Sequence, residues 1–433
     1  MGSHHDNVEI RPDQVELRSS TWTKLPLIGL AMAAGGLGLA YALRGNTDHS
    51  DPKFWTSYLG GFMFAFALAL GGFFFTIIQH LVRAGWSIVL RRIAEHMMIA
   101  LPVIAIFGLP ILFVGAEHVF EWSNTELVKN DPMLSAKVSY LNMGALKLRY
   151  GIYFGLCSIL AMVFWRWSTA QDRATDPTVI EGYSRKARFL SAPALVVFSM
   201  SMTFGAFDFM MSLDPHWFST MFGVYYFSGI VISVMSVLCI TSYLLKRSGY
   251  LEGIVTEEHF HDLGKFMFGF TIFWSYIGFS QYFLIWYANI PEETYFFSYR
   301  GHGQWLHLSI ALVLGRFALP FFTLLRRPLK RHPLGLSLVA VFMLVMEYVD
   351  IFWMTQPPYA HHRVHHYEHV GGPEAMNLAH YFHEHIDFGA TDILCLIGFI
   401  GVFLIPFGWS LGRNKLVPIN DPRLAESIKF ENF

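Results

Sequence analysis

The sequence carries little charge for its length. Of its 433 residues only 15% are Asp, Glu, Lys or Arg, whereas soluble globular proteins contain roughly 25%. The formal net charge of −1 gives no basic surplus, which argues against a nucleic-acid-binding protein. Apolar residues make up 54% of the chain, and the mean hydropathy is +0.40. This composition indicates a polytopic membrane protein rather than two or three soluble domains.

Cysteine is also scarce, and no pattern of metal-ligating residues stands out. The three cysteines are Cys157, Cys239 and Cys395, and each is isolated in an apolar run. This spacing excludes a CxxC metal site, a cysteine-ligated iron–sulfur cluster and a disulfide framework. None of the 20 histidines lies in the middle of an apolar run, where a membrane haem would need its axial ligands. No nucleotide-binding fingerprint or hydrolase triad is present. We therefore expect this chain to bind no cofactor and no metal of its own, and to hold no catalytic residue.

Long apolar runs dominate what is present. A helix needs about 20 apolar residues to cross the hydrocarbon layer, and ten runs satisfy this. We expect an all-α protein with transmembrane helices over residues 25–43, 55–82, 97–114, 148–167, 189–213, 217–245, 264–289, 302–325, 333–354 and 389–410. Pro102 and Pro110 should bend the third helix. Residues 25–410 thus form one membrane domain between the tails 1–24 and 411–433.

The distribution of Lys and Arg predicts the orientation. Basic residues concentrate in the two tails and in every second loop, for example at Arg91 and Arg92 and at Arg326 and Arg327. Cytoplasmic segments carry such an excess of Lys and Arg. We therefore predict that both termini are cytoplasmic.

Four Asp, Glu, Lys or Arg residues fall at least four positions inside the ends of the predicted membrane helices. They are Asp208, Arg316, Glu347 and Asp350, and Glu347 and Asp350 share a helix face because they are three residues apart. A charge inside the bilayer is costly, which makes each residue a functional candidate. Two interpretations remain open. Arg316 and Glu347 could form an ion pair that fixes helix packing, or the carboxylates could belong to a proton path. Asp208 could instead anchor the outer end of its helix.

A second polar group lies at the predicted cytoplasmic side, between the second and third membrane helices. It contains Gln79, His80, Glu95 and His96, close to two arginines. Protonatable residues at this position are expected either as a proton entrance or as a polar rim at the membrane interface. Both interpretations remain open, and we keep His80, Glu95 and His96 as candidates for the proton path.

Two further polar segments have weaker implications. The seventh membrane helix carries polar groups at Tyr276, Ser280, Gln281 and Tyr282. They could bind a quinone head group or form interhelical hydrogen bonds.

Residues 355–388 are expected to form a periplasmic loop rich in histidine, at His361, His362, His365, His366, His369, His380, His383 and His385. No closed set of metal ligands can be selected from them. A contact surface for a periplasmic partner is the favoured interpretation.

Two motifs resemble a known family. One is FDFMMSLDPHWFST at residues 207–220, and the other begins at Trp274 and continues as QYFLIWYANIPEE at residues 281–293. Together with Trp86 and the segment RRIAE at residues 91–95, they resemble the NrfD/polysulfide-reductase-type membrane subunits. The likeness is strongest to the ActF-type subunits of bacterial alternative complex III, a quinol:electron acceptor oxidoreductase, and it extends over nearly the whole chain.

The resemblance implies an architecture, a location in the bacterial cytoplasmic (inner) membrane and a set of partners. The expected architecture is two four-helix bundles, formed by membrane helices 2–5 and 6–9, with two flanking helices. The expected partners are a second NrfD-like membrane subunit, an iron–sulfur protein, and multihaem and monohaem cytochrome c subunits, with a terminal oxidase as a further candidate. The c-type haems, iron–sulfur clusters and menaquinone would then belong to these partners, and lipids would surround the membrane domain.

The expected function is that of a non-catalytic subunit of this respiratory complex. It would act as a scaffold and as a proton-conducting path that accompanies electron transfer from quinol to cytochrome c. Two alternatives stay open, a proton-coupled secondary transporter and a purely structural membrane anchor. Transporters often contain paired helix breaks, of which Gly71, Gly72 and Gly269 give only a faint indication.

Overall fold

The described part of the chain is built from helices. A computed structural model describes residues 10–17, 20–44, 50–370 and 384–431, with the backbone alone for 50 and 361–370, and no strand occurs among them. Nine stretches within these ranges are long and apolar enough to cross a membrane: Thr21–Ala42, Asp51–Leu81, Ile88–Val119, Met143–Gln171, Pro177–Leu213, Phe222–Arg247, Gly303–Leu324, Pro333–Ala360 and Ala390–Arg413. The chain is therefore a multi-pass membrane protein, as its composition predicts.

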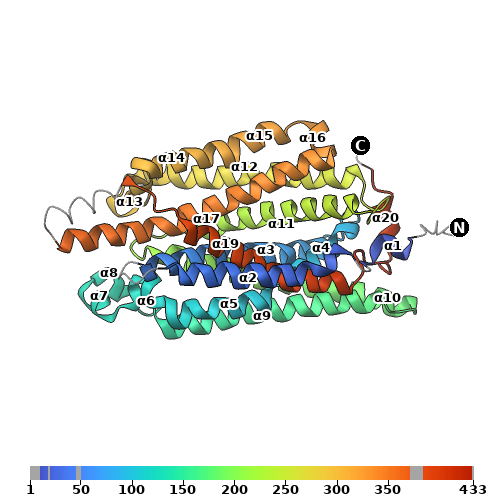
Figure 1. Ribbon diagram of the computed structural model, residues 1–433, viewed down its shortest axis with the longest axis horizontal. Coiled ribbons are helices and arrows are strands. Elements are labelled where there is room, and N and C mark those ends of the chain that lie inside the picture. The colour runs from blue at the N-terminus through green and yellow to red at the C-terminus, as the bar shows by residue number, and fades with distance from the viewer. Residues whose placement is uncertain (1–9, 18–19, 45–49, 371–383, 432–433) are drawn as a thin grey trace.

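The helices of the main array lie side by side along one axis (Figure 1). They are α2 (Leu25–Ala42), α3 (Ser50–Leu81), α4 (Ile88–Met98), α5 (Leu101–Pro110), α9 (Met143–Gln171), α10 (Pro177–Phe209), α11 (Phe222–Arg247), α12 (Glu257–Ala288), α14 (Gly303–Leu312), α15 (Leu319–Leu324), α17 (Pro333–Val370) and α19 (Ala390–Arg413).

Short helices cover the two ends. They are α1 (Pro12–Val15), α6 (Ala116–Val119), α7 (Thr125–Asn130), α8 (Pro132–Lys137), α13 (Pro291–Arg300), α16 (Arg327–Arg331) and α20 (Leu424–Ile428). Single 3-10 turns occupy Thr21–Lys24, Glu121–Ser123 and Met211–Leu213, and π-helical turns occupy Ile111–Gly115 and Val313–Ala318.

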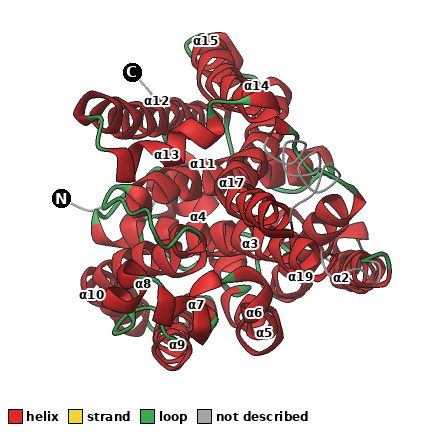
Figure 2. Cartoon of the chain, turned by 90° about the vertical axis from the view of Figure 1, so that its left-hand side faces the viewer, coloured by secondary structure: helices red, strands yellow, loops and turns green. Residues whose placement is uncertain are grey.

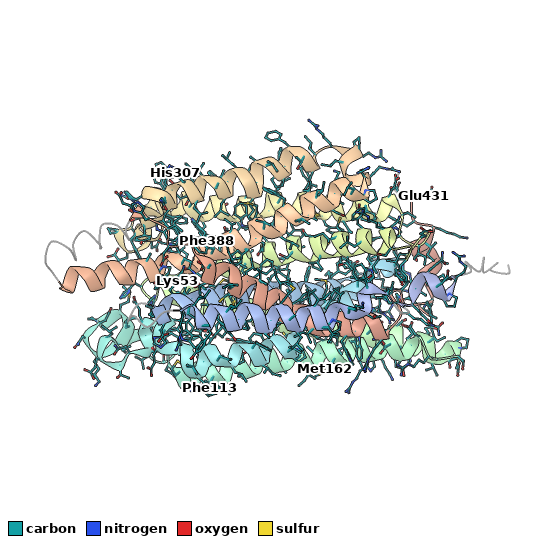
Figure 3. All side chains as sticks on the ribbon, in the orientation of Figure 1. Lys53, Phe113, Met162, His307, Phe388 and Glu431 are labelled. Atoms are coloured by element: carbon teal, nitrogen blue, oxygen red, sulfur yellow. The ribbon has the colours of Figure 1, made fainter. Side chains whose placement is uncertain are left out.

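The first and last described segments meet at one end of the molecule. Helices α1 and α20 both lie at the right of Figure 1, and the backbone N–H of Leu416 donates to the carbonyl of Val15 at 2.8 Å. We call the end of the molecule that contains α1 and α20 the terminus end, and the opposite end the distal end. Figure 3 places Lys53, His307 and Phe388 at the distal end and Glu431 at the terminus end. Both ends of the described chain therefore lie on the same side of the helix array.

Helix α12 runs beside the nine apolar stretches but is not one of them. It is 32 residues long and packs against α11 and α15. Its first turns contain Glu257, Glu258, Asp262 and Lys265, and its second half contains polar residues. The predicted seventh membrane helix thus exists as a long helix, although it is less apolar than the others.

The helices pack in two groups of four around the central helix α3 (Figure 2). In the first group, α3, α4–α5, α9 and α10 pack against one another. In the second group, α11 packs against α12 and α17, and α12 and α17 both contact the interrupted helix α14–α15. Helices α2 and α19 pack together through small residues, since a side chain at Gly36 would lie 2.7 Å from the backbone nitrogen of Gly398.

Several helices extend beyond the predicted apolar runs. Helix α9 begins at Met143 because the Asn142 side chain caps it, and α10 begins at Pro177 because Asp176 accepts a hydrogen bond from the N–H of Thr178. The third predicted span is interrupted between α4 and α5, just before Pro102. Capping residues and polar turns, which hydropathy does not detect, set these ends.

The predicted loop at 355–388 begins as a helix. Helix α17 continues to Val370 although Pro357 and Pro358 lie inside it. Proline removes a backbone donor and usually ends a helix, which is why the sequence predicts a loop here. Five of the eight histidines of this segment therefore lie on a helix, with side chains outside the described residues, at His361, His362, His365, His366 and His369. His380 and His383 lie entirely outside them.

Candidate functional site

The strongest candidate site is a group of buried polar side chains inside the second helix group. Arg316 is 2% exposed, and its Nη2 lies 2.5 Å from Oε2 of Glu347. Its Nη1 donates to the backbone carbonyl of Met346 at 3.1 Å and lies 3.5 Å from Oδ2 of Asp350. Glu347 and Asp350 are each 1% exposed. One guanidinium therefore faces two carboxylates in the interior.

Two more helices complete this group. The hydroxyl of Tyr225 on α11 donates to Oδ1 of Asp350 at 2.6 Å, and Nε1 of Trp274 on α12 donates to Oδ2 at 3.1 Å. The Arg316 guanidinium also lies 5.0 Å from the centre of the Trp274 ring. We call Arg316, Glu347, Asp350, Tyr225 and Trp274 the Arg316 network. Each of the four helices of the second group contributes to it.

Local backbone features make room for the network. Arg316 lies in the π-helical turn Val313–Ala318, and such turns interrupt α-helices frequently at functional sites. On α11, Gly229 faces the Glu347 carboxylate, and a side chain there would lie 2.7 Å from Oε2 of Glu347 and 2.9 Å from Nη2 of Arg316. The site therefore depends on the absence of a side chain at this glycine.

The charges of the network do not balance. If both carboxylates were ionised, the group would carry one surplus negative charge among side chains that are all buried. Burial disfavours such a charge, and a single proton removes it. Nε of Arg316 has no hydrogen-bond partner among the described residues, so the network is not fully satisfied. This arrangement is suited to binding and releasing one proton.

Asp208 occupies a different environment in the first helix group. Nε and Nη2 of Arg149 each donate to one oxygen of Asp208 at 2.9 Å, and the hydroxyl of Tyr153 donates to it at 3.1 Å. The guanidinium of Arg149 also lies 3.9 Å from the centre of the Tyr140 ring. Here one cation matches one carboxylate in a two-pronged ion pair. This geometry fits the anchoring interpretation of Asp208 better than an exchangeable proton.

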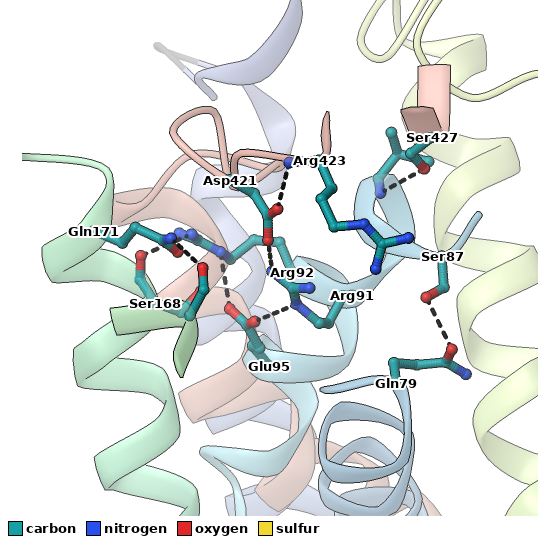
Figure 4. Close-up of polar contacts among 12 residues, drawn as sticks. Gln79, Ser87, Arg91, Arg92, Glu95, Ser168, Gln171, Asp421, Arg423 and Ser427 are labelled. Atoms are coloured by element: carbon teal, nitrogen blue, oxygen red, sulfur yellow. Dashed lines mark hydrogen bonds and ion pairs between the residues drawn. The ribbon is translucent and has the colours of Figure 1, made fainter. Parts of the chain in front are cut away.

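A third group of charges closes the terminus end of the first helix group (Figure 4). Glu95 lies 3.2 Å from Nε of Arg91 and 2.9 Å from Nε of Arg92. Arg92 reaches Asp172 at 2.8 Å, and Arg91 reaches Asp421 of the C-terminal segment at 2.6 Å. We call these five residues the terminus-end cluster. It again contains one more carboxylate than cations.

The predicted neighbours of Glu95 do not all join this cluster. His96 is buried and its Nδ1 lies 2.8 Å from the hydroxyl of Ser410 on α19, whereas His80 stacks on Phe164 at 6.0 Å between ring centroids. No hydrogen bond or ion pair joins His80 to Glu95 among the described residues. Glu95 and His96 are fully buried, unlike the side chains of an exposed polar rim.

A buried ion pair at the distal end was not predicted. Nζ of Lys53 on α3 lies 2.9 Å from Oδ2 of Asp392, and Ser57 donates to Oδ1 of Asp392 at 2.6 Å. Asp392 is the third residue of the apolar helix α19. Its position near the start of an apolar run was the signal in the sequence, and the same holds for Arg149, the second residue of the predicted helix 148–167.

The polar residues predicted in the seventh membrane helix face outward in part. Tyr276 is 63% exposed and Tyr282 is 46% exposed. Neither side chain forms a hydrogen bond to another helix among the described residues.

No group of three or more His, Cys, Asp or Glu side chains that could hold a metal ion occurs among the described residues.

Comparison with protein-family models and with curated proteins finds no match to this chain. Function is therefore inferred from the sequence motifs and from the geometry of the four buried charge groups.

Proposed function

We propose that the chain is an integral membrane subunit of a quinol-oxidising respiratory complex of the alternative complex III type, in which it serves as a scaffold and conducts protons. The motifs at residues 207–220 and 274–293 support the assignment to NrfD-like subunits. Electron transfer would take place on partner subunits that carry iron–sulfur clusters and c-type haems and that oxidise menaquinol. The present chain would supply none of these groups.

The proposed topology has ten membrane crossings with both termini in the cytoplasm. Nine apolar stretches alone would leave the termini on opposite sides, whereas α1 and α20 lie at the same end. Counting α12 as a crossing removes this difference. The terminus end is then cytoplasmic, in agreement with its excess of Lys and Arg in the sequence.

One observation carries the proton-conducting role: Arg316 is buried with two carboxylates rather than one. An ion pair that only fixed helix packing would need a single acid, as the pair of Arg149 and Asp208 illustrates. The second acid in the Arg316 network adds a site whose protonation changes the net charge from −1 to zero. Glu347 and Asp350 would therefore share one exchangeable proton.

Polar groups on α11 offer a route between the network and the cytoplasm. Toward the terminus end from Gly229, this helix carries buried hydroxyls at Ser233, Ser236 and Ser242. The hydroxyls of Ser233 and Ser242 have no hydrogen-bond partner among the described residues. A hydroxyl both donates and accepts, so such a row can pass a proton. The terminus-end cluster, with Glu95 and the nearby His80 and His96, would form an entrance.

The experiment compares proton release per transferred electron. The complex is purified, reconstituted into liposomes and supplied with quinol, and Glu347→Gln is measured beside the unaltered protein. We expect the variant to release fewer protons per electron while quinol oxidation stays measurable, because Gln cannot bind and release a proton. Glu126→Gln, at an exposed position of α7, is the matched control and should behave like the unaltered protein.

Unchanged proton release in Glu347→Gln would remove this residue from the mechanism and leave the chain as a membrane anchor.

The transporter alternative is tested by extraction in mild detergent. A transporter should purify alone, whereas a respiratory subunit should purify with red c-type haem proteins. Gly71, Gly72 and Gly269 lie inside the continuous helices α3 and α12, so they mark no helix break of the kind found in transporters.

A further inference from the structure

A pocket of about 320 Å³ lies at the terminus end, between the last turns of α9 and α19 and the segment that follows α1 (Figure 1). Its charged lining residues are the cations Arg173, Arg413 and Lys415 and the acids Glu16 and Asp172. Neither the sequence motifs nor the proposed proton path accounts for this pocket.

The pocket carries more positive than negative charge. Asp172 already pairs with Arg92 at 2.8 Å. No ion pair joins Arg173, Arg413 or Lys415 to a carboxylate among the described residues. With Arg92 included, four cations face two carboxylates, and with the rest of the terminus-end cluster added, five cations face four. The surplus suits a negatively charged ligand.

The pocket lies at the level where the lipid-facing surface of the protein begins. Gly412 belongs to its lining, and a side chain at Gly412 would lie 3.8 Å from Thr23. Thr23 comes just before α2, whose first turns expose Leu27 and Leu30 by 69% and 55%. Leucines exposed on a membrane helix face the hydrocarbon layer. The pocket is therefore at the depth of the phospholipid head groups.

Two tryptophans adjoin the cations on the side of the membrane interior. Trp409 precedes Arg413 by one turn of α19, and the Arg413 guanidinium lies 5.0 Å from the centre of its ring. The ring of Trp409 is 40% exposed and lies 6.0 Å from that of Trp165 on α9. Tryptophan is enriched at the boundary between head groups and acyl chains. Cations and an apolar surface thus lie next to each other.

We propose that this pocket binds an anionic phospholipid, whose phosphate group contacts Arg173, Arg413 and Lys415 and whose acyl chains lie along Trp165 and Trp409. Basic pockets between membrane helices bind acidic lipid head groups in this way, and a guanidinium can donate two hydrogen bonds to one phosphate. The lipid would connect α9, α19 and the N-terminal segment. The inference is independent of the proton path, because it requires only that the helices cross a membrane.

The test titrates the protein, purified in mild detergent with whatever subunits accompany it, with phosphatidylglycerol and counts bound lipids by native mass spectrometry. Arg413→Gln combined with Lys415→Gln removes two cations, each of which strengthens the attraction to an acidic lipid about fivefold. We expect the affinity for one phosphatidylglycerol per chain to fall about 25-fold. Arg413→Lys keeps the charge and should bind nearly as well as the unaltered protein.

Arg326→Gln combined with Arg327→Gln is the matched control, because it removes two exposed cations at the same end but outside the pocket. This variant should keep the affinity of the unaltered protein, and thermal unfolding shows whether each variant is folded. If the double variant in the pocket does not fold, Arg413→Gln alone decides, with an expected loss of about fivefold.

Two other ligands test the chemistry of the site. Phosphatidylcholine, which has no net charge, should bind much more weakly than phosphatidylglycerol, and inorganic phosphate at the same concentration should not displace the lipid. Equal affinity of the pocket variant and the control, equal binding of phosphatidylcholine, or displacement by inorganic phosphate would each overturn the inference. None of these results affects the proton assay of Glu347→Gln, so the two proposals fail separately.

Discussion

At the scale of single residues, the function proposed for the interior depends on how closely α11 approaches Glu347. Gly229 allows this approach, whereas Gly205 on α10 has only the ring of Phe66 nearby, 3.6 Å from the position of an added Cβ. The two glycines are both buried in helices, but only one touches charged atoms. This difference gives a matched pair of substitutions.

Gly229→Ala should displace the Glu347 carboxylate from Arg316 and lower proton release per electron. Overpacking of this kind typically costs about 1–3 kcal/mol of unfolding free energy. Gly205→Ala should cost less than about 1 kcal/mol, because its Cβ makes an ordinary contact. Unfolding in detergent measures the stability and liposome assays measure the protons. Equal behaviour of the two variants would show that the space beside Glu347 is not critical.

The residues of the network divide into those that the sequence reveals and those that only the fold reveals. Arg316, Glu347 and Asp350 were predictable because a charge within an apolar run is conspicuous, and their spacing predicted a common face. Tyr225 and Trp274 were not predictable, because aromatic residues are common in membrane helices and the hydrogen-bond partner of each lies on another helix. Arg149 and Asp392 were missed because they lie within a few residues of a helix end, where hydropathy draws an uncertain boundary.

At the scale of elements, the C-terminal segment acts as a strap across the terminus end. Nδ2 of Asn420 donates to the carbonyl of Ala174 at 2.9 Å, the hydroxyl of Ser427 donates to the carbonyl of Trp86 at 2.6 Å, and Asp421 pairs with Arg91. The sequence shows only a polar tail here, because its contacts are with segments far away in the chain. The strap therefore links the ends of α4, α9 and α10.

The strap makes stability depend on pH in a defined direction. Burial raises the pKa of Asp421, but the Arg91 guanidinium 2.6 Å away outweighs it, so that the pKa lies below its ordinary value. A group whose pKa is lowered on folding stabilises the protein above its unfolded pKa, near 4, and loses this contribution as the pH falls further. Asp421→Asn should cost about 3 kcal/mol at neutral pH and remove this part of the acid dependence.

Unfolding of the Asp421→Asn variant in detergent between about pH 3 and pH 7 checks this expectation. Asp13→Asn, at an exposed position of α1, serves as the control and should follow the unaltered protein. An Asp421→Asn profile parallel to that of the unaltered protein at every pH would contradict the assigned role of the ion pair with Arg91.

At the scale of the whole molecule, the number of crossings depends on α12. Apolar length alone identifies nine stretches, because the polar residues in the second half of α12 lower its hydropathy. The positive-inside distribution of Lys and Arg and the common position of α1 and α20 both agree with the even number of crossings that we propose. The sequence thus predicts the general architecture well, while one helix needs the three-dimensional arrangement to be assigned.

Single introduced cysteines test this assignment. Glu252→Cys lies before α12 at the terminus end, and Glu292→Cys lies after it at the distal end, whereas the native cysteines are buried. A membrane-impermeant maleimide should label Glu252→Cys only from the cytoplasmic side and Glu292→Cys only from the opposite side. Labelling of both from one side would mean that α12 does not cross the membrane.

The proton that we propose Glu347 and Asp350 share can be observed most directly by infrared difference spectroscopy of the complex at rest and during quinol oxidation. We predict a carbonyl band of a buried protonated carboxyl group that changes on turnover and disappears or shifts in Glu347→Gln or Asp350→Asn. The same band should persist in Asp208→Asn, since Asp208 pairs one-to-one with Arg149. A spectrum without such a band, or with a band that neither substitution affects, would contradict the account.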